Sequence, residues 1–317
     1  MTIIVERAAG LATVQDAGRH GWRACGVVSG GAVDSLALAT ANLLVGNDAD
    51  AAALECTLVG PTLGVERDVT IALTGADLGL RIDGVAHPAW RAIDVAAGAR
   101  IDFAGRRCGC RGIVAVAGGI DVPAVLGSRS TDLTAGFGGV EGRTLRAGDR
   151  LPIGPRRPAW PGGGRAVAGA LRSHGGGAVR VVRGPEADRF APAAWDTFLS
   201  ARYAVGAASD RMGCRLEGPP LESAAPGDML SQGVVPGTVQ VPPDGRPIVL
   251  MADAPVTGGY PRIGVVIGAD LPIVAQTMPG ETLTFRTVTL DEARAAWRRR
   301  ARALARLRIG LALGGGP

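Results

Sequence analysis

Lysine is missing from this sequence: all 34 basic residues among its 317 are arginines. A chain without lysine cannot form a Schiff base through a side-chain amine, use a lysine general base, or hold nucleotide phosphates with a Walker A lysine. Any anion bound by this chain must therefore contact arginine guanidinium groups or backbone N–H groups.

Histidine, cysteine and aromatic residues are also scarce. The 3 histidines, His20, His87 and His174, lie too far apart in the sequence to predict a metal site. The 5 cysteines include no C-x-x-C pair, and the chain does not open with a charged segment followed by an apolar one. These features favour free thiols in a cytoplasmic protein that is not exported. Because aromatic residues make up only 4% of the chain, Val, Leu, Ile and Ala must form the core.

What the sequence does contain is a β-rich pattern that occurs twice. Short apolar runs are separated by Gly and Pro throughout. RIDG at 81–84 is echoed by RLEG at 215–218, and RGIVAVAGG from Arg111 by RPIVLMADA from Arg246, at nearly the same offset. We therefore predict a mainly β protein (β-rich α+β) of two duplicated β-domains with a few short helices.

Changes in composition place the boundaries of these halves. The predicted segments are an N-terminal half with a helical insertion (1–154), a Pro- and Gly-rich linker (155–178), a C-terminal half (179–288) and a basic C-terminal helix and tail (289–317). Apolar residues at helical spacing predict the helix of the first half over about 33–45.

The C-terminal helix begins with a capping box, Thr289 with Glu292, and carries seven Arg between Arg294 and Arg308. Nucleic-acid or membrane binding is one interpretation of such a helix. We favour a solvated helix packed through Trp297, because the sequence contains no other basic cluster interleaved with aromatic residues.

Polar residues gather in glycine-rich segments at predicted strand ends of both halves. These segments are TVQDAGRHGW (13–22), LTGAD (73–77), GSRSTD (127–132), SDRMGCRLEGP (209–219) and MADAPVTGGYPRIG (251–264). Taken singly, each is explained by an Asp that caps a turn or by a surface ion pair. As a set they predict a shared cleft in which Asp and Glu act as acids or bases and Arg holds anions.

Several ordered motifs carry a resemblance to one family. VQDAGRHGW, ANLLVGN, LTGAD, VAVAGGIDVPAVLGSRSTDL, SDRMGCRLEGP, SQGVVPGTVQVPPDGRPIVLMADAPVTGGYPRIGVVIGADLPIVAQ and PGETLTF span about residues 5 to 287. Together they resemble the allophanate hydrolase subunit 2 family. It is also known as the biotin-dependent carboxyltransferase-like or kinase-inhibitor-antagonist family, and it includes the C component of ATP-dependent 5-oxoprolinase.

The resemblance implies two related cyclophilin-like β-barrel halves and a function within a complex. In the first reading the chain joins a subunit 1-type (kinase-inhibitor-like) partner, with a third lactam-binding subunit also open, to convert 5-oxoproline to glutamate with ATP. The ATP site would be shared with, or lie on, a partner. In the second reading it moves CO₂ from carboxybiotin to urea or another amide, which would involve biotin. In the third it is a non-catalytic regulator of a kinase-inhibitor-like partner.

The turn Thr257–Pro261 is the first expected part of the site. Gly258 and Gly259 permit positive φ and close backbone approach, so this turn is either a tight corner or a cradle whose N–H groups face a substrate carbonyl or carboxylate. Tyr260 belongs to the same turn. In relatives a Lys commonly follows it where this chain has Arg262, and a Ser commonly stands where this chain has Gly30.

The remaining expected site residues supply charge and hydrogen bonds. Arg262 or Arg215 would pair with the negative charge of the substrate, and Asp253 or Glu217 would act as base. Gln240 would hydrogen-bond the lactam or ureido group. The other expected substrate contacts are Arg211, Gln15 and Asp16, and no metal is expected.

Overall fold

The computed structural model contains two compact units. It describes residues 2–156, 163–167, 171, 176–223 and 229–313. The first unit comprises the described residues of 1–20, 30–174 and 302–317, and the second comprises those of 21–29 and 175–301. Much of the predicted linker, namely 157–162, 168–170 and 172–175, lies outside the described residues.

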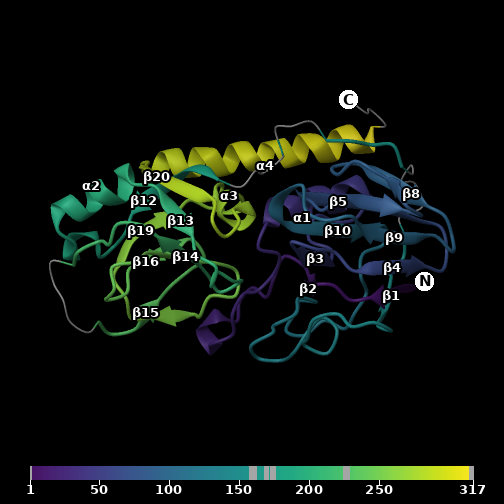
Figure 1. The fold of residues 1–317 in the computed structure, drawn as a ribbon, viewed down its shortest axis with the longest axis horizontal. Helices are drawn as coiled ribbons and strands as arrows, with labels where there is room; N and C mark the ends of the chain where they lie inside the picture. Colours follow the sequence, from purple (N-terminus) through teal and green to yellow (C-terminus); the bar gives the residue numbers. More distant parts are fainter. Residues whose placement is uncertain (1, 157–162, 168–170, 172–175, 224–228, 314–317) are drawn as a thin grey trace. The chain divides into compact units, whose positions relative to one another are not determined.

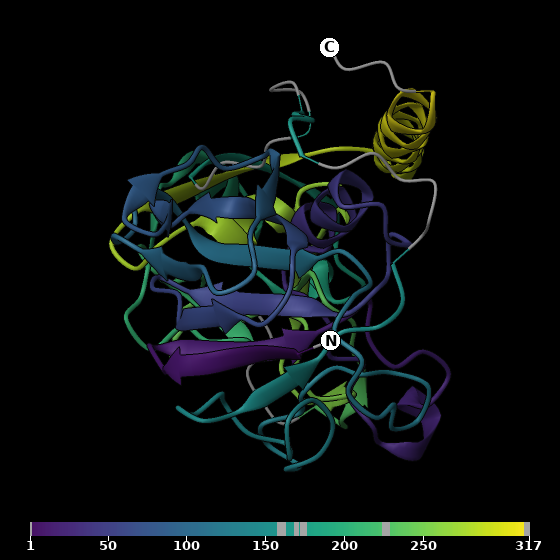
Figure 2. The same ribbon diagram turned by 90° about the vertical axis from the view of Figure 1, so that its right-hand side faces the viewer.

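The first unit is made of short strands and one helix. Its strands are β1 (Thr2–Arg7), β2 (Leu11–Gln15), β3 (Ala53–Thr57), β4 (Thr62–Val65), β5 (Val69–Asp77), β6 (Leu80–Ile82), β7 (Val85–Ala86), β8 (Ala92–Val95), β9 (Arg100–Phe103), β10 (Cys108–Val116) and β11 (Arg150–Pro152). They form a six-stranded sheet, β11-β1-β4-β9-β6-β7, and a five-stranded sheet, β2-β3-β10-β5-β8 (Figure 1). In Figure 2, β1 is the purple strand; it pairs with β4 and β11.

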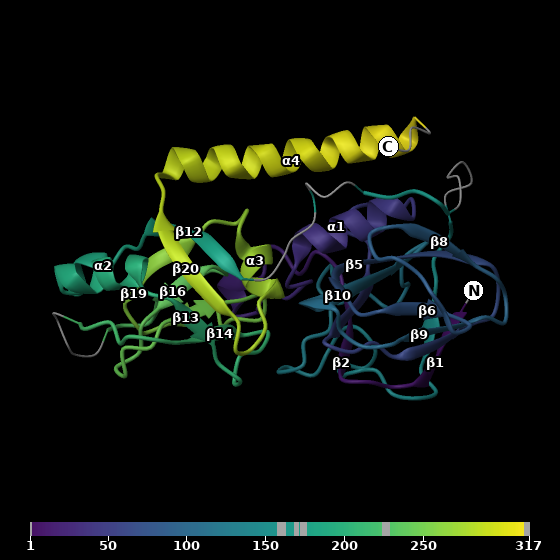
Figure 3. The same ribbon diagram turned by 45° about the horizontal axis from the view of Figure 1, so that its top comes forward.

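Strand β10 shows why its sequence reads as a continuous apolar run. Val114 and Val116 belong to the core shared by the two sheets, whereas Ile113 and Ala115 pack with helix α1 (Ser35–Leu44) on the opposite face. Because both faces of β10 are buried here, apolar residues occupy both of them, and this part of the strand shows no alternation of apolar and polar residues. Figure 3 shows α1 lying along β5 and β10. The helix predicted over about 33–45 is therefore confirmed as α1.

The second unit is a closed barrel with short helices. Its strands are β12 (Gly177–Arg183), β13 (Tyr203–Val205), β14 (Gly213–Glu217), β16 (Thr238–Gln240), β17 (Ile248–Leu250), β19 (Arg262–Val266) and β20 (Thr282–Thr287). They close in the order β12-β19-β16-β17-β14-β13-β20, and β12 pairs with β20 in parallel. Two further short strands, β15 (Gln232–Gly233) and β18 (Thr257–Gly258), pair with each other in an antiparallel ladder outside the barrel. The short helices are η1 (Arg23–Cys25), η3 (Ala187–Arg189), α2 (Pro192–Ser200) and α3 (Leu271–Gln276).

An aromatic cluster fills part of this barrel. Phe198 of α2 stacks on Phe285 of β20 with ring centroids 4.4 Å apart, and Tyr203 lies at 6.0 Å from both rings. Burial raises the pKa of the Tyr203 hydroxyl to about 12. A chain with few aromatic residues thus places three of them together in one core.

The mainly β fold is confirmed, and the echoed segments fall on strands in both units. RGIVAVAGG contains part of β10, and RPIVLMADA contains β17. The strands of the second unit close into a barrel, whereas those of the first form two sheets. The sequence indicated the same strand pattern in both halves, but only the strands of the second unit close into a barrel.

The C-terminal helix α4 (Leu290–Ala312) begins at the predicted capping box. Thr289 N donates to Glu292 Oε2 (2.7 Å), and Glu292 N donates to Thr289 Oγ1 (3.2 Å). The ring of Trp297 lies over Gly268 but remains 53% exposed, and Ala296 is the buried residue of this part of the helix. In the part of the chain that the structure describes, no helix combines the length and apolar character of a membrane crossing.

Candidate functional site

A cavity of about 900 Å³ opens in the second unit, beside the turn that follows β18. It is lined by Gln240 at the end of β16 and by the turn residues Thr257, Gly258, Gly259 and Tyr260. The other lining residues are Phe190, Pro220, Leu221, Glu222, Ser223, Met229, Val241, Pro242, Pro243, Asp244, Gly245, Pro255 and Pro261. The structure thus brings five of the predicted site residues to one cavity.

The amide of Gln240 is the buried polar group of this cavity. Its side chain is held on a strand between β17 and β19, and Nε2 donates to the backbone oxygen of Tyr260 (3.3 Å). A Cβ atom built on Gly258 would lie 2.5 Å from Gln240 Nε2. Glycine at 258 therefore allows the turn to approach the amide closely.

The two glycines of the turn do not use the left-handed region. Neither Gly258 nor Gly259 is among the residues with positive φ. Of the two reasons predicted for glycine here, positive φ is wrong and close backbone approach is correct. Within the described residues, the backbone N–H groups of Gly259 and Tyr260 donate no hydrogen bond. Both donors belong to residues that line the cavity.

Arg262 lies beyond the turn and is engaged by protein groups. Its Nε donates to Glu186 Oε2 (2.5 Å), its Nη2 donates to Glu186 Oε1 and to Gln232 Oε1 (2.7 Å), and its Nη1 donates to the backbone oxygen of Gly233 (3.0 Å). Hydrogen bonding to Arg262 lowers the pKa of the Glu186 carboxyl, and the same bonds raise the pKa of Arg262. Instead of lining the cavity, Arg262 fixes the β15–β18 ladder that carries the turn.

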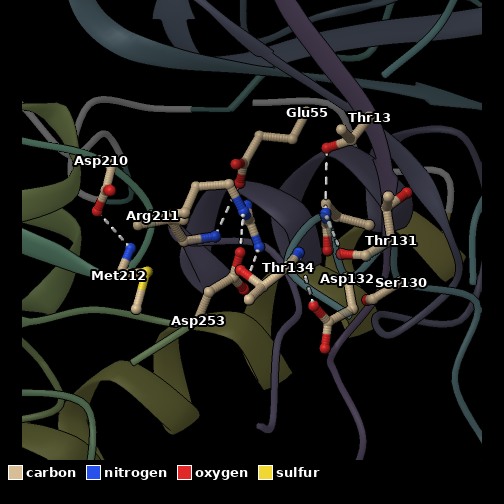
Figure 4. A network of polar contacts seen from close by, with 12 residues as sticks. Thr13, Glu55, Ser130, Thr131, Asp132, Thr134, Asp210, Arg211, Met212 and Asp253 are labelled. Atoms are coloured by element: carbon tan, nitrogen blue, oxygen red, sulfur yellow. Dashed lines mark hydrogen bonds and ion pairs between the residues drawn. The ribbon is translucent and has the colours of Figure 1, made fainter. Parts of the chain in front are cut away.

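Arg211 and Asp253 form a buried bidentate ion pair. Arg211 Nε donates to Asp253 Oδ2 (2.7 Å) and Arg211 Nη2 donates to Asp253 Oδ1 (2.9 Å), as Figure 4 shows. Neither residue lines the cavity. Both carboxylate oxygens of Asp253 therefore already accept hydrogen bonds from Arg211, and the role of Asp253 as base stays a prediction.

Arg215 and Glu217 lie on β14, away from the cavity lining. Buried and exposed residues alternate along this strand, and both side chains are on its exposed face. Their i, i+2 spacing therefore reflects one face of a strand. The structure does not bring either residue to the cavity, and their catalytic roles stay predictions.

Gln15 and Asp16 belong to the first unit, where they order the GSRSTD loop. Asp16 Oδ1 accepts hydrogen bonds from the hydroxyls of Ser128 and Ser130 (2.6 Å each), and Oδ2 accepts from Arg129 N (2.5 Å). Gln15 Nε2 donates to Thr13 Oγ1 and to the backbone oxygen of Thr131 (3.1 Å each). Neither residue lines the cavity of the second unit, and their part in substrate binding stays a prediction.

Sequence reasoning missed the acidic side of the cavity. Glu222 and Asp244 line it, and the carboxylate of Glu222 has no hydrogen bond or ion pair within the described residues. Asp244 Oδ1 accepts from Arg246 N (3.0 Å). The only sequence signals are two proline pairs, GPPLES and VPPDG, which are typical of ordinary turns until the barrel brings them together.

The model of the carboxyltransferase domain, subdomain A and B, matches residues 25–287 of the chain. The chain belongs to this family. The prediction from the sequence motifs is therefore confirmed at the family level. Among curated relatives, the C component of 5-oxoprolinase from Escherichia coli is 46% identical over 288 residues, which covers 90% of this chain and 91% of that protein.

Two further comparisons extend this picture. The C component of 5-oxoprolinase from Haemophilus influenzae is 39% identical over 289 residues, covering 89% of this chain and 90% of that protein. The crystal structure of Kluyveromyces lactis urea amidolyase superposes with a TM-score of 0.90 at 28% identity, over 96% of this chain but only 20% of that one. The family thus includes both separate subunits and parts of much longer chains.

Proposed function

We propose that this chain is a subunit of an ATP-dependent 5-oxoprolinase, which opens the lactam of 5-oxoproline to give glutamate. The observation that carries this proposal is the 46% identity to the C component of a 5-oxoprolinase, which extends over 91% of that relative. A subunit 1-type partner and a lactam-binding subunit would complete the complex. ATP would bind on a partner or at a site shared with one, because this chain has no lysine for a Walker A loop.

The cavity of the second unit is the part of this chain that suits a lactam. A lactam has one C=O acceptor and one N–H donor. The N–H groups of Gly259 and Tyr260 match the acceptor, and the amide oxygen of Gln240 matches the donor. Proline, leucine and phenylalanine side chains around these groups would exclude water from the ring.

Reconstitution tests the proposal. The chain alone and the chain co-purified with its two partners are assayed for ATP-dependent release of glutamate from 5-oxoproline. We expect turnover only in the complex. Within the complex, Gln240→Ala should lower activity about 10- to 100-fold, because it removes an oriented contact to the substrate. Arg286→Ala, at an exposed position of β20 outside the cavity lining, should leave it unchanged. A stable complex without turnover contradicts the proposal.

Carboxyl transfer is the second candidate, favoured by the similarity to K. lactis urea amidolyase. In that case the chain would accept CO₂ from carboxybiotin and pass it to urea or another amide. Supplying the complex with carboxybiotin and urea separates the two: carboxylated urea without glutamate release supports this alternative.

A further inference from the structure

The charge of the cavity does not match the whole of 5-oxoproline. Its charged lining residues are Glu222 and Asp244, and no arginine lines it among the described residues. The nearest cation along the turn, Arg262, is bound to Glu186. The cavity is therefore acidic, in a chain whose formal net charge is +5.

5-Oxoproline has two chemically different ends. At neutral pH its carboxylate is negatively charged, whereas its lactam is neutral. A carboxylate in this cavity would meet the carboxylate of Glu222, which has no partner among the described residues. Two like charges in one cavity repel each other, which disfavours binding of the carboxylate beside Glu222.

The neutral end fits the same groups well. The backbone N–H groups of Gly259 and Tyr260, which donate no hydrogen bond within the described residues, and the Gln240 amide offer both donors and an acceptor. We infer that this chain recognises the uncharged lactam end of the substrate, and that a cationic side chain of a partner subunit binds the substrate carboxylate. The inference rests on the proposed function and assigns the charge recognition to the partner. Glu222 is then the residue that makes the isolated chain reject anions.

Binding to the isolated full chain tests this division. The probes are 5-oxoproline, its neutral amide 5-oxoprolinamide, and 2-pyrrolidinone, titrated by calorimetry or ligand-observed NMR. We expect both neutral lactams to bind, and 5-oxoproline to bind about tenfold more weakly than its amide. In the complete complex the preference should reverse, since the partner then supplies the cation.

Substitutions at Glu222 make the test specific. Because this side chain is exposed, its replacement should not affect folding. Glu222→Gln should remove the discrimination in the isolated chain, and Glu222→Arg should reverse it in favour of 5-oxoproline. Asp196→Arg, an equal change of charge on the exposed side of α2, should leave the discrimination unchanged.

Other outcomes overturn the inference. It fails if the isolated chain binds 5-oxoproline as tightly as the amide, or binds neither neutral lactam. The proposed function can survive that result, because it is judged by glutamate release from the complex. Conversely, a complex without turnover removes the proposed function even if the isolated chain prefers neutral lactams.

Discussion

At the scale of single residues, glycine at 258 has a purpose that sequence alone could not distinguish. Consecutive glycines in TGGYP are compatible with a left-handed turn or with a close approach between backbone and another group. Choosing between them requires the position of Gln240, which lies 18 residues earlier and on a different strand. The sequence around Gly258 therefore does not show that a Cβ atom there would meet the side chain of Gln240.

Gly258→Ala should displace the Gln240 amide and weaken lactam binding. The added Cβ would lie 2.5 Å from Nε2, so the amide or the turn must move. We expect affinity for 5-oxoprolinamide to fall by about 10- to 100-fold. Gly233→Ala is the matched control, because a Cβ there meets no atom within 4 Å although Gly233 pairs with Thr257 in the same ladder. Equal losses in both variants would point to damage of the ladder as a whole.

The ion pair of Glu186 and Arg262 makes part of the stability of the second unit depend on pH. The pKa of Glu186 is lowered from its ordinary value of 4.5, so its ionised form favours the folded state. This contribution is fully present above about pH 4.5 and is lost as the pH falls through the lower, folded-state pKa. The direction follows from the unfolded chain binding the proton more readily.

Glu186→Gln should therefore destabilise the protein near neutral pH more than in acid. We expect a loss of about 2 kcal/mol at about pH 7, as for charge-assisted hydrogen bonds, and a smaller loss at about pH 3. Urea unfolding at both pH values measures this. Asp188→Asn serves as the control, since the carboxylate of Asp188 is 93% exposed in its pair with Arg183. The same loss for Glu186→Gln at both pH values would contradict the expectation.

At the scale of elements, the helix ends were predicted correctly where short capping motifs mark them in the sequence. Helix α1 begins where Asp34 Oδ1 accepts a hydrogen bond from Ala37 N (2.9 Å) and ends before Gly46, whose φ is 82°. Helix α4 begins at its capping box. Side-chain caps and a left-handed glycine act within a few residues, so the sequence contains all that is needed to predict them.

Thr289→Ala should weaken the start of α4. The substitution removes the hydroxyl that accepts from Glu292 N, and loss of such a cap costs about 1 kcal/mol of unfolding free energy. Urea denaturation followed by circular dichroism measures the change. Thr289→Ser keeps the hydroxyl and should retain most of the stability. If both variants unfold alike, the cap contributes little to this helix.

At the scale of the whole molecule, the sequence predicted the mainly β class and the family, but only part of the candidate site. The turn 257–260 was found because glycine and proline interrupt apolar runs there, and Gln240 because it follows a predicted strand. Glu222 and Asp244 were missed because barrel closure brings their loops to the turn, and no local pattern records that. Arg211 and Asp253 were selected for their charges, but in the structure the two side chains form an ion pair with each other.

The cysteines of this chain are distributed in a way that suits measurement. Cys56, Cys110 and Cys214 are buried, and burial raises the pKa of the Cys56 thiol to about 12. Cys25 and Cys108 are exposed, and they belong to the second and the first unit respectively. A thiol-reactive fluorophore pair would therefore attach to one position on each unit of the unmodified protein. Energy transfer between the dyes would report in solution whether binding of the partners alters the separation of the two units.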